Sequence, residues 1–134
     1  MFDRNDTITI WNRLRILKES DRLYRKVLRG CKFIDRLQSP VSGHGAVEAN
    51  GFTVIIPETP LYRPYNEWAA LDETGRGEYF TLAKGDVAAL GGVDSAGATP
   101  VAIKAALGPY CFEIRTIIDN TRGKRGGHYR IEGN

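Results

Sequence analysis

Hydrophobic and polar residues alternate with the period of a β-strand near the start of the chain. Within residues 7–16 (TITIWNRLRI), Ile8, Ile10, Leu14 and Ile16 fall on one face, and threonines and arginines fall on the other. Side chains of a strand point to opposite faces in turn, so one apolar face predicts a strand with one buried side. We therefore predict a first strand here.

The following run, residues 22–34 (RLYRKVLRGCKFI), fits two patterns. Its apolar positions fit one face of a strand, and some of them also fit a helical stripe. Gly30 and the β-branched residues near it disfavour a helix. We therefore predict a second strand, joined to the first by a hairpin turn near residues 18–21.

The next segments predict one more strand and then a long loop. Residues 47–57 form a third predicted strand that ends at a proline, and from 58 to 77 the alternation lapses among prolines and glycines. A loop of this length in a small domain is usually functional. Its aromatic residues Tyr62, Tyr65 and Trp68 predict docking onto the chain's own barrel or onto a neighbouring subunit. We expect the loop to be ordered mainly against a neighbouring subunit, with these three residues as anchors.

The second half of the chain predicts short strands, one helix and a hairpin. Short strands over 79–82 and 87–90 flank a turn at 84–86. A Thr-Pro step predicts the N-cap and the first helical position of a short helix over 99–106. Two alternating runs around a loop rich in glycine and cations predict a long C-terminal hairpin over about 110–133.

These elements predict a single domain that spans residues 1–134. A chain of 134 residues can bury one core without disulfides or metals, but it is too short for two independent cores. We predict a mostly β fold, a small antiparallel β-barrel or sandwich with one short helix and a long loop. Seven alternating apolar residues are its predicted core: Ile8, Ile10, Val54, Ile56, Phe112, Ile114 and Ile131.

The net charge of +3 hides an uneven distribution. Residues 1–36 hold ten Lys/Arg against five Asp/Glu, residues 37–118 hold five against nine, and the last sixteen residues hold four against two. The chain is therefore basic at both ends and acidic in the middle. This asymmetry suits contacts between copies or neighbours and a local basic surface near nucleic acid. The alternative is a solvated surface of mixed charge.

The candidates for chemistry are few. Cys31 and Cys111 lie far apart inside β-type runs, so we expect two buried free thiols. The two histidines, His44 and His128, are not spaced as a ligand pair, so we expect no metal site and no cofactor. No apolar stretch approaches the roughly 20 residues that cross a bilayer. The start of the chain lacks the pattern of a signal peptide, so we expect a protein made in a cytoplasm and not bound to a membrane.

The C-terminal loop is a candidate binding element. Arg122, Lys124 and Arg125 on a glycine-rich tip could contact phosphates without reading sequence. With His128, the same cations fit a weak ribonuclease pattern, in which the histidine is the general base. The simplest alternative is a soluble hairpin tip.

Four segments in chain order resemble one protein family. They are residues 6–12 (DTITIWN), 24–30 (YRKVLRG), 79–86 (YFTLAKGD) and the ending 119–133 with its DNTRG and HYRIEG phrases. This set is similar to a family of small proteins encoded in head-to-tail modules of siphophages and prophages of Gram-positive bacteria. In more distant outline it resembles head-closure, or stopper, connector proteins. The matching turn and hairpin positions are Gly85, Asp86, Asp119, Asn120, Gly123 and His128.

This chain also departs from the family pattern. Ala83 and Lys84 replace a lysine-proline step before Gly85, Tyr129 stands where tryptophan is more frequent, and the 60–77 stretch matches poorly.

The resemblance implies a structural protein of the virion neck and not an enzyme. Its copies would assemble as a ring below the portal and adaptor proteins, contact a tail-terminator or tail-completion protein, and help to retain packaged DNA. Contact with that DNA would be non-specific. The protein would be assembled in the host bacterial cytoplasm. The alternatives are a minor capsid or tail-completion protein and, from another class, a small nucleic-acid-binding protein or ribonuclease.

Overall fold

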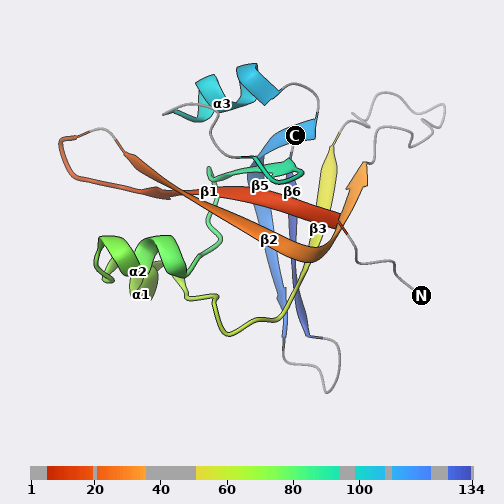
Figure 1. Ribbon diagram of the computed structural model, residues 1–134, viewed down its shortest axis with the longest axis horizontal. Helices are drawn as coiled ribbons and strands as arrows, with labels where there is room; N and C mark the ends of the chain where they lie inside the picture. The colour runs from red at the N-terminus through yellow and green to blue at the C-terminus, as the bar shows by residue number, and fades with distance from the viewer. Residues whose placement is uncertain are drawn as a thin grey trace.

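The fold is a closed β-barrel, as the strand pattern predicts. The computed structural model describes residues 6–19, 21–35, 51–93, 99–107, 110–121 and 127–133. Six antiparallel strands close in the order β1-β2-β3-β6-β5-β4 (Figure 1). The strands are β1 Asp6–Leu14, β2 Arg22–Asp35, β3 Phe52–Pro57, β4 Val87–Leu90, β5 Cys111–Asn120 and β6 His128–Gly133. The three short helices are α1 Tyr65–Ala69, α2 Glu73–Glu78 and α3 Pro100–Leu107.

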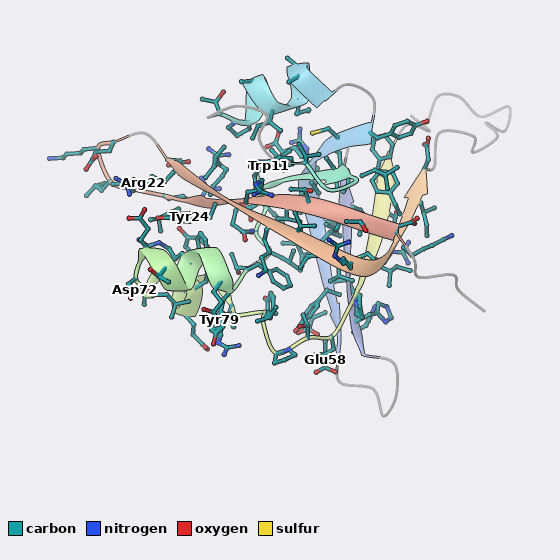
Figure 2. The ribbon with its side chains drawn as sticks, in the orientation of Figure 1. Trp11, Arg22, Tyr24, Glu58, Asp72 and Tyr79 are labelled. Atoms are coloured by element: carbon teal, nitrogen blue, oxygen red, sulfur yellow. The ribbon has the colours of Figure 1, made fainter. Side chains whose placement is uncertain are left out.

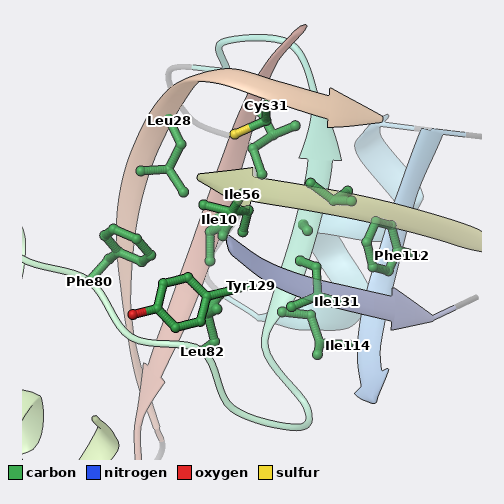
Figure 3. Packing of buried hydrophobic residues seen from close by; sticks show 13 residues of the cluster. Ile10, Leu28, Cys31, Ile56, Phe80, Leu82, Phe112, Ile114, Tyr129 and Ile131 are labelled. Carbon is green, nitrogen blue, oxygen red and sulfur yellow. The ribbon is translucent and has the colours of Figure 1, made fainter. Parts of the chain in front are cut away.

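The barrel interior is the main core, and its predicted members are confirmed. All seven residues of the predicted core are fully or almost fully buried, and all belong to one cluster (Figure 3). The other buried members of this cluster are Leu28, Cys31, Phe80, Leu82, Ala88 and Tyr129. The alternation in β1, β3, β5 and β6 therefore marks the strand face that points into the barrel.

A second, smaller core lies on the outer surface of the barrel beneath α3. Trp11, Val87, Ala89 and Cys111 point away from the barrel interior and pack with Ile103 of α3. This helix begins as predicted, because the Thr99 hydroxyl accepts a hydrogen bond from the Ala102 amide at 3.2 Å. Both sides of β1 are therefore buried near the middle of the strand.

β1 and β2 form a long ribbon that extends beyond the barrel (Figure 1). β1 pairs with β4 only from Ile8 to Trp11, and β2 pairs with β3 only from Lys32 to Asp35. The pairing of β1 with β2 continues to the Leu14–Arg22 pair, and the hairpin turns near the predicted position. We call this projecting pair the β1–β2 ribbon.

A β-bulge in β2 accompanies the curvature of the ribbon. The register between β1 and β2 shifts between Asp6 and Ile8, and Gly30 has a φ of +75°. Such a φ favours glycine, and an extra residue at this point strengthens the twist of the strand. Gly30, which weakens a helical interpretation of this run, thus has a specific place in a strand.

The predicted long loop over 58–77 is wrong in part, because it contains α1 and α2. These helices are too short to show a 3.6-residue pattern, and Gly75 and Gly77 within α2 conceal it further. α2 is nevertheless capped, since the Asp72 carboxylate accepts from the Gly75 amide at 2.7 Å. The two helices form a lobe on one side of the β1–β2 ribbon, which we call the helical lobe (Figure 1).

The predicted strand over 79–82 is also wrong. Phe80 makes only an isolated bridge to Tyr62, and residues 81–86 do not form a strand. Instead, the side chains of Phe80 and Leu82 pack in the barrel core. The third strand begins at Phe52, and residues 47–50 of its predicted range lie outside the described residues.

Candidate interaction site

The turn at Gly85 and Asp86 is joined to β1 by a buried polar cluster. Asp86 is 1% exposed, and its carboxylate accepts hydrogen bonds from the Asn12 side chain at 2.9 Å, the Arg13 amide at 3.0 Å and the Ala83 amide at 3.2 Å. Asn12 also donates to the Thr81 carbonyl at 2.6 Å and accepts from the Thr81 amide at 3.2 Å. We call this cluster the Asn12–Asp86 joint. It fixes the 81–86 segment against the ribbon.

Gly85 is required at this turn for two reasons. Its φ is +94°, which residues with a side chain rarely adopt. A Cβ atom here would also lie 3.1 Å from both the Arg13 and Arg15 guanidinium groups. Arg13 donates to the Gly85 carbonyl and Arg15 to the Lys84 carbonyl, so both arginines hold the turn from outside.

Burial dominates the electrostatics of the joint. It raises the pKa of the Asp86 carboxyl from 3.8 to about 6. The hydrogen bonds from Asn12, Arg13 and Ala83, and the charge of Arg15, act in the opposite direction because they favour the carboxylate. Between these two pKa values the unfolded chain has released the proton while the folded chain keeps it, so stability falls as the pH rises through this range.

This shift predicts a measurable difference between the native protein and the Asp86→Asn variant. The variant cannot titrate at this position, so the loss of stability that Asp86 causes between about pH 4 and pH 7 occurs in the native protein alone. We expect its stability advantage over the variant to shrink by roughly 3 kcal/mol, at about 1.4 kcal/mol for each pH unit. Urea unfolding at several pH values measures this advantage. Parallel curves for the two proteins would contradict a raised pKa at Asp86.

The anchors predicted in the 58–77 segment lie mostly within the chain's own fold. Trp68 is fully buried, and its ring meets that of Tyr24 edge-on at 5.5 Å. Its indole nitrogen donates to the carbonyls of Arg76 at 3.1 Å and Tyr79 at 3.3 Å. Tyr65 is half-buried, and its hydroxyl accepts from the Arg15 amide at 3.1 Å. Trp68 thus fastens the helical lobe to the ribbon.

Tyr62 packs against the barrel core and not within the lobe. Its ring lies 4.4 Å from that of Tyr129 and 5.8 Å from that of Phe80. Burial raises the pKa of both tyrosines, and the charge of Asp119 adds to this effect. Of the three aromatic residues predicted at a subunit interface, Trp68 is fully buried within the chain, whereas Tyr62 and Tyr65 are half-buried, and the role of these residues at an interface stays a prediction.

The C-terminal hairpin brings its family-matched residues together at its base. Asn120 pairs with His128 across β5 and β6, with the Asn120 amide nitrogen 3.2 Å from Nε2 of His128. Asp119 accepts from the amide of Thr121 at 2.9 Å, a contact typical of turns. The tip residues Arg122, Gly123, Lys124 and Arg125 lie outside the described residues, as does His44.

Both cysteines are buried free thiols, as predicted. Burial raises the pKa of Cys31 to about 12 and that of Cys111 to about 11, so neither is a reactive thiolate at neutral pH. Among the described residues, no three His, Cys, Asp or Glu side chains gather where they could hold a metal ion. None of the described helices has the length and apolar character needed to cross a membrane.

Sequence reasoning missed Asn12 as the partner of Asp86. The signal was present, because Asn12 continues the inward face of Ile8 and Ile10 with a polar residue. A buried polar side chain needs a partner, but the pattern does not say which one. The partner lies 74 residues away along the chain, so only the tertiary structure identifies it.

The closed barrel, with one helix on its outer surface and a helical lobe on its ribbon, defines a small, mostly β domain. Its sequence matches the model of a family of unknown function, DUF6751, over residues 2–134, and the chain belongs to that family. No curated protein and no solved structure gives a significant match.

Proposed function

We propose that this protein is a structural subunit of a bacteriophage neck. It is a head-closure-like connector whose copies form a ring below the portal and receive the tail. The proposal is supported by four sequence segments that resemble such proteins in chain order. The closed antiparallel barrel agrees with the β-barrel subunit that this resemblance implies.

The Asn12–Asp86 joint is the observation that supports the proposal best. It connects two of the resembling segments, 6–12 and 79–86, through side chains that are buried and paired. These segments therefore maintain one arrangement, in which the ribbon and the turn are rigidly attached to the barrel. A ring subunit needs such rigid attachment, because head-to-tail contacts close only when each copy presents its surfaces at a fixed angle.

The proposed role is carried out by contacts and charge. The partners would be other copies of this chain, the portal or adaptor above and a tail-terminator or tail-completion protein below. The hairpin-tip cations Arg122, Lys124 and Arg125 would approach packaged DNA or an acidic neighbouring ring. Contacts with phosphate of this kind require no catalytic residue and depend on salt.

Locating the chain in phage particles tests the proposal. We expect cryo-electron microscopy of particles to show several copies in a ring with cyclic symmetry, between the portal and the tail. Without this protein, we expect heads that do not join tails and that lose DNA. A single copy or an isolated dimer in the neck would contradict the proposal. Copies on the shell would favour a minor capsid protein, and RNA cleavage lost in a His128→Ala variant would favour the ribonuclease alternative.

A further inference from the structure

The two sides of the β1–β2 ribbon differ in charge. Arg25 pairs with Trp11 across the ribbon, and Trp11 packs beneath α3, so Arg25 lies on the α3 side. Arg29 follows Leu28, which points into the barrel, and therefore points outward as well. Both arginines are exposed. We call this pair the basic face.

Neither arginine of the basic face is neutralised within the part of the chain that the structure describes. Arg25 donates a hydrogen bond to the Val93 carbonyl at 3.0 Å, which holds the guanidinium without cancelling its charge. Among the described residues, no ion pair involves Arg25 or Arg29. The basic face can therefore attract an acidic partner.

The opposite side of the ribbon carries the helical lobe, whose exposed surface is acidic. Tyr24, the neighbour of Arg25 in β2, points the other way and contacts Trp68 of the lobe. Tyr24 and the lobe residues Asp72 and Tyr79 are seen on this side in Figure 2. Four exposed carboxylates form what we call the acidic face: Glu67, Asp72, Glu73 and Glu78.

The nearby cations Lys26, Arg63 and Arg76 are less exposed than the four carboxylates of the acidic face. Lys26 donates to the Glu78 carbonyl at 2.7 Å. Arg76 lies over the Tyr24 ring at 5.2 Å and donates to the carbonyls of Ala69 and Leu71. Arg63 lies over the Tyr79 ring at 4.4 Å and donates to backbone carbonyls. In the described part of the chain, the one ion pair of the acidic face joins Glu73 to Arg22 at 3.9 Å. Both side chains of that pair are well exposed, so it contributes little.

The basic and acidic faces lie on opposite sides of one ribbon, so they cannot meet within a single chain. They can meet between two copies. We infer that the acidic face of one copy docks on the basic face of the next. This contact joins unlike surfaces, so its repetition gives a ring or an open filament. The inference rests on the proposed function in taking the neighbour in the ring to be another copy of this chain.

Exchange of charge between the two faces tests this contact. One variant, Arg25→Glu with Arg29→Glu, makes both faces acidic. A second variant, Glu67→Lys with Glu78→Lys, brings the net charge of the acidic face from −4 to zero, and it spares the helix cap at Asp72 and the ion pair of Glu73. Sedimentation equilibrium of the full chain at low salt should show self-association of the native protein that weakens as salt rises. Each variant alone should associate at least roughly tenfold more weakly.

Mixing the two variants should restore association, because the unchanged acidic face of the first variant again meets the unchanged basic face of the second. A matched control, Lys84→Glu with Arg115→Glu, changes the net charge as the first variant does, at exposed positions outside both faces. It should associate like the native protein. An equal loss in this control, or no recovery in the mixture, would overturn the inference.

Cross-linking gives a second measurement that also detects weak association. A chain with Val27→Cys and Asn66→Cys keeps every charge of both faces and places one thiol between Arg25 and Arg29 and the other beside Glu67. It should give a ladder of trimers and longer species with a short thiol cross-linker, because Cys31 and Cys111 are buried. Each single variant alone should give no ladder. If the double variant gives no ladder, the contact is wrong. The proposed function is then tested separately, by whether native particles show the chain as a ring in the neck.

Discussion

Replacing Phe112 by Ala is expected to lower the free energy of unfolding by about 3 to 5 kcal/mol. Phe112 is fully buried in the barrel and stacks on Phe52 with ring centroids 5.6 Å apart. The Phe33 ring lies 6.2 Å away, so the removed ring has neighbours from β2 and β3. The lower free energy of unfolding has two causes. The variant buries less apolar surface, and a cavity remains because the closed barrel cannot contract to fill it. Denaturant unfolding of both proteins measures the difference.

Ile118→Ala is the matched control, because Ile118 lies on the same strand but is 38% exposed. We expect a loss of less than about 1 kcal/mol for this change. The slope of unfolding against denaturant should remain the same for all three proteins, because the surface exposed on unfolding is similar. Similar losses for the two variants would contradict the placement of Phe112 in the core.

Replacing Trp68 by Ala is expected to detach the helical lobe at a cost of about 3 to 5 kcal/mol. Trp68 is fully buried, packs against Tyr24 of the ribbon and donates to two carbonyls at the far end of the lobe. The lobe consists of two short helices that would not be stable in isolation. Amide hydrogen exchange should therefore show lost protection over residues 65–80, while the barrel strands stay protected.

Tyr65→Phe is the control for the lobe. It removes a hydroxyl that accepts from the Arg15 amide but keeps the aromatic ring, so we expect a loss of about 0.5 to 1.5 kcal/mol. The lobe should remain protected in this variant. If Trp68→Ala leaves the lobe protected, the lobe is held by other contacts and Trp68 is not its anchor.

These two expectations separate the roles of the barrel and the lobe. The barrel core determines whether the chain folds, and Trp68 determines whether the acidic face is presented in a fixed orientation. A Trp68→Ala variant should therefore also lose the proposed contact between copies, although it carries every charge of that contact. This links the stability of the lobe to assembly in a way that a simple charge interaction would not.

The sequence by itself determined the barrel strands and most of the core. Alternation over residues 7–16, 110–118 and 128–132 marks strands because one face is buried, and a period of two residues follows directly from strand geometry. The hairpin turn near Lys18 and the start of α3 followed from local chemistry. These features depend on residues that are close together along the chain.

Only the tertiary structure decided the parts that depend on distant partners. The helices α1 and α2 are too short to be stable alone, and they form because Trp68 packs against Tyr24 of the ribbon. The 79–82 segment does not pair as a strand, because its residues enter the barrel core instead. Asn12 and Asp86 are each ordinary polar residues in the sequence, and burial next to one another makes them a joint. Contacts between residues far apart in the sequence therefore determine where the helical lobe and the oppositely charged faces lie on this small barrel.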